Sequence, residues 1–151
     1  MLLCRDAGLR SGTALRLSAQ HLADGGRMIQ TRTKNGAQAQ VPTTERLRRL
    51  LLAAERMCVP DQPLVAAMAG RASVRRQHAG DMLGAAQRRL GLKKRWTFHD
   101  LRRTAARELY KDTGDLRKVQ ALLAHSNLAQ SLHYLSDRGV TVDASDLRQR
   151  A

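Results

Sequence analysis

Histidine, arginine and tyrosine side chains occur at short spacings in the second half of the chain. His99 and Arg102 are three positions apart, so in a helix they face the same way, one turn apart. Imidazole and guanidinium groups both bind phosphate, and the guanidinium fork donates two hydrogen bonds to one phosphate. This pair therefore predicts a helix face suited to a phosphate group. Farther along, Tyr134 follows His125 by nine positions, in a short segment that also carries leucines.

Two basic residues nearer the start of the chain lie in turn sequences. Arg10 ends the triplet Gly-Leu-Arg, and Lys34 precedes Asn-Gly in a turn that starts at Thr33. Like Arg102, Arg10 stays charged at any working pH and can bind two phosphate oxygens at once. A solvated arginine would also suit the first turn, and ordinary turn chemistry would also explain the lysine in the second.

The histidines and the tyrosine also have simpler structural interpretations. A tyrosine among helical leucines, such as Tyr134, is usually a core residue whose hydroxyl reaches the surface. His99 could cap the first turn of its own helix. His125 could lie at a helix C-terminus, where the macrodipole favours a histidine.

Taken together, six residues resemble the motif set of the tyrosine recombinases, the phage-integrase family. The family motifs are an Arg after Gly-Leu, a Lys in a β-turn, His-x-x-Arg, a Gly-His-Ser-like segment, and a Tyr nine positions past that histidine. In this chain the corresponding residues are Arg10, Lys34, His99, Arg102, His125 and Tyr134. The resemblance extends from about Ala7 to Ser136.

The resemblance implies a site-specific recombinase or integrase that cleaves and rejoins DNA through a covalent 3′-phosphotyrosyl intermediate. Arg10 and Arg102 would stabilise the charge that attack adds to the non-bridging phosphate oxygens. Tyr134 would be the nucleophile. A phenol has a pKa near 10, so it needs positive surroundings and a nearby proton acceptor.

The other three roles follow from the resemblance alone. His99 would accept the phenolic proton or position the phenol, Lys34 would protonate the departing 5′ oxygen, and His125 would donate a hydrogen bond to the phosphate. The covalent link conserves the bond energy, so neither ATP nor a redox cofactor is expected. The sequence has no carboxylate cluster of the kind that Mg²⁺ nucleases use, so we also expect no metal.

The chain departs from the family pattern at two positions and at its start. Thr13 stands where the family usually has an acidic residue, and Ala124 replaces the Gly of Gly-His-Ser. The family also usually has an N-terminal DNA-clamping domain and further helices before the first arginine. We therefore expect residues 1–138 to be an N-terminally truncated catalytic domain, and residues 139–151 a polar tail.

The charge of the chain also points to nucleic acid. Twenty-seven Lys and Arg against 13 Asp and Glu give a net charge of +14, as expected of a protein that binds phosphate backbones. A ribosomal-type basic protein, or a basic surface without a ligand, would fit the charge as well. Candidate DNA contacts, which could also form a merely solvated face, are Arg71, Arg75, Arg76, Arg88, Arg89, Lys93, Lys94 and Arg95.

The remaining composition narrows the class of protein. Cys4 and Cys58 are far apart and belong to no Cys/His cluster, so the sequence predicts reduced thiols with neither disulfide framework nor zinc site. No segment approaches the roughly 18 apolar residues of a membrane span, and the start lacks the apolar stretch of a signal peptide. We expect a cytoplasmic protein.

The hydrophobic patterning predicts one α+β domain, mostly helical, with a small antiparallel sheet near the N-terminus. Turn signals between Leu17 and Thr43 predict two or three strands, the last from Ala37 to Val41. Thr43 or Thr44 would cap the next helix. Further helices are expected at about 73–90, 99–111, 116–124 and 128–135.

Two other functions fit the same residues. One is a DNA-binding remnant or regulator that keeps the fold without useful turnover, and the other is a type IB topoisomerase-like activity. The expected partner is double-stranded DNA. By the resemblance, strand exchange would need a homo-oligomer of about four protomers on two duplexes, although an isolated fragment could be monomeric.

Overall fold

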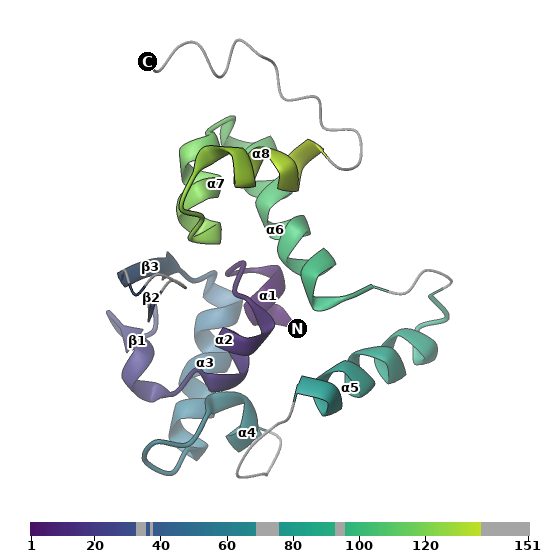
Figure 1. Cartoon of the computed structure of the whole chain (residues 1–151). Helices are drawn as coiled ribbons and strands as arrows, with labels where there is room; N and C mark the ends of the chain where they lie inside the picture. Colours follow the sequence, from purple (N-terminus) through teal and green to yellow (C-terminus); the bar gives the residue numbers. More distant parts are fainter. Residues whose placement is uncertain (33–35, 37, 69–75, 93–95, 137–151) are drawn as a thin grey trace.

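The computed structural model describes residues 1–32, 36, 38–68, 76–92 and 96–136. In chain order the elements are α1 (Leu2–Arg5), α2 (Ser11–Arg16), the 3-10 helix η1 (Ala19–His21), β1 (Leu22–Ala23), β2 (Met28–Arg32), β3 (Gln38–Pro42), α3 (Glu45–Met57), α4 (Leu64–Met68), α5 (Arg76–Arg89), α6 (Phe98–Thr113), α7 (Leu116–Leu123) and α8 (Leu128–Ser136). Helices dominate, which confirms the predicted α+β class (Figure 1).

The sheet has three antiparallel strands in the order β1-β2-β3. Ile29 pairs with both Leu22 and Val41, so it is the centre of the sheet's buried face. β3 begins at Gln38 and includes Pro42, one residue beyond the predicted end of the strand. A proline is tolerated here because β3 lies at the edge of the sheet, where one side of the strand needs no ladder bonds.

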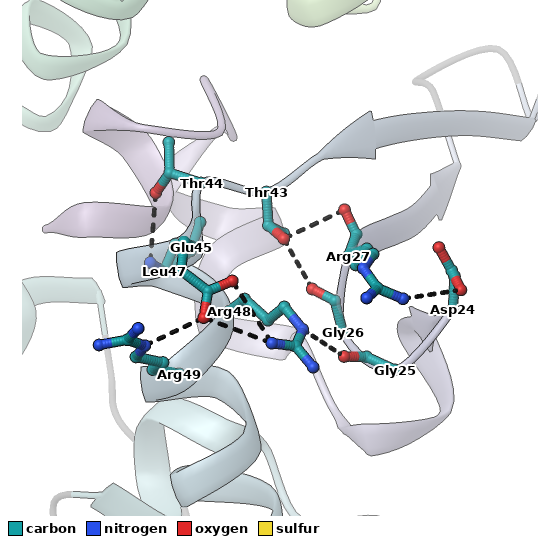
Figure 2. A network of polar contacts seen from close by, with 10 residues as sticks. All are labelled: Asp24, Gly25, Gly26, Arg27, Thr43, Thr44, Glu45, Leu47, Arg48 and Arg49. Carbon is teal, nitrogen blue, oxygen red and sulfur yellow. Dashed lines mark hydrogen bonds and ion pairs between the residues drawn. The ribbon is translucent and has the colours of Figure 1, made fainter.

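A polar network joins the β1–β2 turn to the first turn of α3 (Figure 2). The Thr43 hydroxyl donates to the carbonyl oxygen of Gly26 at 2.7 Å, and Arg48 Nε donates to that of Gly25 at 2.9 Å. Thr44 is the N-cap of α3, since its hydroxyl accepts a hydrogen bond from the backbone N–H of Leu47 at 3.2 Å. The sheet is thereby fixed to the helix that follows it.

Helix α6 connects two groups of elements. α1 to α4 and the sheet enclose one apolar cluster, against which Phe98 and Leu101 at the start of α6 pack. α7 and α8 enclose a second cluster around Ala106, Leu123 and Leu135, at the level of the later turns of α6 (Figure 1). Side chains of α6 therefore pack against both groups, its first turns against one and its later turns against the other.

The start of α6 is fixed by two sets of hydrogen bonds. Thr97 and Asp100 form a capping box, in which the Thr97 hydroxyl accepts from the Asp100 backbone N–H and the carboxylate accepts from the Thr97 backbone N–H. Just before it, the buried side chain of Gln87 bonds both the backbone N–H and the carbonyl of Trp96, at 2.9 and 2.7 Å. α6 therefore starts at a defined place and orientation.

The long helices agree with the sequence prediction, but three short ones were not predicted. α2, η1 and α4 have six, three and five residues, which is too short for an apolar period to show. The expected helix at 73–90 runs from Arg76 to Arg89 in the structure, with 73–75 outside the described residues. The expected tail, 139–151, also lies outside them. None of the described helices combines the length and apolar content that a membrane span requires.

Candidate active site

A cavity of about 500 Å³ opens at the N-terminal end of α6. His99, Arg102 and Tyr134 line it from α6 and α8, and Arg10 lines it from the start of α2. Its full lining is Leu9, Arg10, Ser11, Gly12, Thr13, Arg16, Arg76, Thr97, Phe98, His99, Arg102 and Tyr134. His125 lines an adjoining cavity, which Arg10 and Tyr134 also line. The structure thus brings together five of the six residues that the motifs singled out.

Arg102 is the most buried of these residues, with 4% of its surface exposed. Its two terminal nitrogens donate hydrogen bonds to the carbonyl oxygens of Gly8 and Leu123, which tie the α1–α2 connection to the end of α7. Its Nε is buried and has no hydrogen-bond partner among the described residues. Burial, and then the nearby charge of Arg10, lower the pKa of Arg102, and interaction with Tyr134 opposes this shift. A guanidinium carries five N–H donors, and the two carbonyls take only one from each terminal nitrogen.

Gly8 is required where it stands. Its φ of +58° is in the left-handed region, and a Cβ there would lie 3.1 Å from Leu122 Cγ on α7. The close approach presents the Gly8 carbonyl to Arg102 and places Arg10, two residues later, at the mouth of the cavity. Thr13 lines the same cavity but supplies no carboxylate to brace Arg10.

Tyr134 lies between two imidazole rings. Its hydroxyl oxygen is 3.1 Å from His99 Nδ1, and its ring centroid lies 4.9 Å from that of His99 and 5.0 Å from that of His125, both in edge-on geometry. Its ring also packs against the second apolar cluster. The simpler interpretation of Tyr134 as a packing residue is therefore correct for its ring, while its hydroxyl faces a proton acceptor.

His99 has a lowered pKa, so its ring is neutral at neutral pH. Partial desolvation is the largest cause, followed by the charges of Arg103 and Arg102, against the opposing charge of Asp100. With its proton on Nε2, the ring can accept a hydrogen bond from the Tyr134 hydroxyl at Nδ1. Thr97, not His99, caps α6, so the capping interpretation of His99 is wrong.

His125 is more strongly desolvated. Burial, with the charges of Arg102, Arg10 and His99, lowers its pKa to about 4. Its Nδ1 lies 3.1 Å from the hydroxyl oxygen of Ser131, a residue with no exposed surface. When the Ser131 hydroxyl donates to Nδ1, the imidazole carries its proton on Nε2 and presents an N–H donor there. His125 does follow the end of α7, but its ring is held by α8.

Ala124 ends α7 in the left-handed conformation, with φ 46° and ψ 49°. Replacing Ala124 with glycine is expected to raise the free energy of unfolding by about 0.5–1 kcal/mol, because relief of the Cβ clash exceeds the added entropy of the unfolded chain. Thermal denaturation measures the change. The control, Ala121→Gly at an exposed position inside α7, is expected to destabilise by about 1 kcal/mol. Equal losses for both variants would contradict the assignment of left-handed strain.

Of the remaining predicted residues, three lie in the described part of the chain and six lie outside it. Arg76 lines the cavity, and Arg88 and Arg89 are exposed in the last turn of α5. The others lie outside the described residues: Lys34, Arg71, Arg75, Lys93, Lys94 and Arg95.

Three residues at the site were missed by sequence reasoning. Arg16 lines the cavity six positions after Arg10, Arg103 contacts the Tyr134 ring, and Ser131 contacts His125. The helical spacing of Ser131, three residues before Tyr134, was a usable signal, as was that of Arg103, four residues after His99. Among the described residues, no group of three or more His, Cys, Asp or Glu side chains is placed to hold a metal ion.

Solved structures share this fold. XerA recombinase is 21% identical with a TM-score of 0.76, and the alignment covers 97% of this chain and 53% of that one. The Tn1549 transposon integrase, in complex with a circular intermediate DNA, is 17% identical with a TM-score of 0.72, covering 88% and 52%. The catalytic domain of bacteriophage HP1 integrase is 19% identical with a TM-score of 0.62, covering 87% and 69%. This chain thus spans about half the length of the first two structures.

The sequence comparisons agree with the motif analysis. No curated protein matches the chain. The sequence model of the phage integrase family matches residues 1–138, which include the range from about Ala7 to Ser136 over which the motifs extend. The resemblance drawn from the six motif residues is thereby confirmed: this chain belongs to the phage integrase family.

Proposed function

We propose that residues 1–138 form the catalytic domain of a site-specific DNA recombinase, which cleaves and rejoins DNA through Tyr134 without a metal. The observation that carries the proposal is the 3.1 Å contact between the Tyr134 hydroxyl and His99 Nδ1, in a cavity that Arg10 and Arg102 also line. Nucleophile, proton acceptor and anion-binding groups then surround one phosphate.

The phosphate binds first. Arg10 is exposed at the mouth of the cavity and Arg102 is held rigidly at its wall, so one guanidinium can follow the DNA while the other stays fixed. Donors fixed in advance around the non-bridging oxygens stabilise the charge that develops during attack. The Nε2–H of His125, set by Ser131, supplies a further neutral donor.

Attack then follows. As the Tyr134 oxygen bonds to phosphorus, its proton passes to His99 Nδ1. The bond from phosphorus to the 5′ oxygen breaks, and that oxygen takes a proton from Lys34. The products are a 3′-phosphotyrosyl enzyme and a free 5′ hydroxyl. Rejoining is the reverse reaction, in which a 5′ hydroxyl attacks phosphorus and the tyrosine leaves.

The DNA duplex would lie over the basic mouth of this cavity. Arg16 and Arg76 belong to that mouth, and the net charge of +14 favours a polyanion. The Tn1549 integrase with DNA supports the same partner. We extend the predicted contacts to Arg71, Arg75, Arg88, Arg89, Lys93, Lys94 and Arg95. Strand exchange between two duplexes would need a homo-oligomer.

Covalent capture tests the proposal. The purified chain is mixed, with EDTA present, with a pool of randomised DNA duplexes, each carrying one 5′-bridging phosphorothiolate. The thiolate leaves readily and does not reverse the reaction, so the adduct accumulates. We expect a denaturation-resistant adduct, located by peptide mass on Tyr134, and a shared sequence among the recovered strands. DNA binding without an adduct would favour the non-catalytic DNA-binding function, and an adduct with no shared sequence would favour a topoisomerase.

Lys34 can be tested by the same chemistry. Replacing Lys34 with methionine is expected to slow cleavage of ordinary DNA about 100-fold, because an alkoxide leaves poorly without a proton donor. The phosphorothiolate duplex should be cleaved at nearly the normal rate, since a thiolate with a pKa near 8.5 leaves unprotonated. Rates come from single-turnover gels, with Lys111→Met at an exposed position of α6 as control. Equal slowing on both substrates would contradict the role of general acid.

A further inference from the structure

The ring of Tyr134 has a third polar neighbour besides the two histidines. The guanidinium carbon of Arg103 lies over the ring, 5.5 Å from its centroid. A cation over the face of a tyrosine is attracted by the ring quadrupole. Three groups therefore fix the position of the ring: the edge-on imidazoles of His99 and His125 and the cation of Arg103.

Arg103 and Arg102 are neighbours in sequence, but their side chains contact different parts of the protein. Arg102 points into the protein and bonds the backbone of Gly8 and Leu123. Arg103 is half-buried and lies four residues after His99, one helical turn along the same face of α6. This spacing lets one side of α6 provide both the acceptor for the phenolic proton and the cation above the phenol ring.

We infer that Arg103 is a positioning residue for the nucleophile, which holds the Tyr134 ring so that its hydroxyl stays against the His99 imidazole. This inference rests on the proposed function, because it assigns a role within the same cleavage step. Arg103 does not need to touch the phosphate. It acts through Tyr134 and His99, in contrast to Arg10 and Arg102.

The charge of Arg103 supports the same step. After desolvation, it is the largest cause of the lowered pKa of His99, and a neutral His99 can accept the proton. Among the described residues, the other polar and charged groups near His99 are Arg102 and Asp100 on α6, Tyr134 on α8, and His125. Arg10, Arg16 and Arg76 line the same cavity as His99. Removing the Arg103 charge alone leaves these unchanged, so the pKa of His99 should rise.

The test compares Arg103→Met and Arg103→Lys with the Lys111→Met control, which removes one exposed charge from the same helix. Cleavage of the phosphorothiolate duplex is followed in single turnover, at saturating DNA and across pH. We expect Arg103→Met to be about fivefold slower at its plateau, since a cation-π contact is lost. We also expect the acid limb of its pH–rate profile to move to higher pH, because His99 must lose its own proton before it can accept one from Tyr134. Arg103→Lys should restore the limb.

A titration of the DNA-free chain separates this inference from the proposed function. The histidine ring protons are followed by NMR against pH, and the His99 signal should titrate at higher pH in Arg103→Met than in the normal chain. The inference would be overturned if the unsubstituted chain cleaves DNA and Arg103→Met has the same plateau rate and the same acid limb of the pH–rate profile. An unchanged His99 titration would overturn it even if no DNA is cleaved, whereas absence of any adduct from the normal chain would overturn the proposed function.

Discussion

Replacing Tyr134 with phenylalanine is expected to abolish the covalent DNA adduct while leaving both the fold and DNA binding in place. Phenylalanine keeps the ring that packs against the second apolar cluster and the two imidazoles. Only the hydroxyl that bonds His99 Nδ1 is lost, at a site open to solvent, so the free energy of unfolding should change by about 1 kcal/mol or less. The phenylalanine ring carries no oxygen that could attack phosphorus.

The chain offers a matched control in its only other tyrosine, Tyr110. Tyr110 lies on α6 and packs against the same apolar cluster, but it does not line either cavity at the site. Tyr110→Phe should therefore give the adduct at the normal rate. DNA affinity, measured by anisotropy at fixed salt, should be similar for both variants. Adduct formation by Tyr134→Phe would end the assignment of the nucleophile.

The elements that sequence reasoning predicted are those with local signals. α3 and α6 have capping threonines, and the C-cap of α6 is Gly114, whose φ of 63° suits glycine. α2 and α4 have no such signals in the sequence. Their few residues become helical because the helix buries Ala14 and Leu64 in the core. Tertiary packing decides such short helices, and a periodicity argument cannot detect it.

The site divides in the same way. The motif order predicted that six residues meet at one phosphate. It did not predict which contacts hold each of them there. Arg102 contacts carbonyls 94 and 21 residues away, and nothing in its neighbourhood in the sequence indicates this. The hydroxyl that orients His125 comes from Ser131, on the far side of a turn. Such contacts depend on how α6, α7 and α8 pack, and this packing appears only in three dimensions.

Arg102→Met is expected to lower both stability and cleavage, since Arg102 serves both. Two buried carbonyl acceptors, on Gly8 and Leu123, would lose their charged donor, at a cost of about 3 kcal/mol in the free energy of unfolding. For a domain of this size the melting temperature should fall by roughly 10 °C. Loss of the fixed donor at the phosphate should slow cleavage by about 100- to 1,000-fold.

A second arginine of α6 separates these effects from the mere loss of a buried charge. Arg107 Nε and Nη2 are buried, and neither has a hydrogen-bond partner among the described residues, so Arg107→Met should cost little stability and no activity. Arg102→Lys keeps a charge, but its donors share one nitrogen and lack the planar fork that reaches both carbonyls, so it should recover only part of each loss. Melting curves and single-turnover rates at low temperature, where all variants stay folded, measure both. If Arg102→Met cleaved normally after losing stability, Arg102 would be a packing residue only, and the phosphate would need another fixed donor.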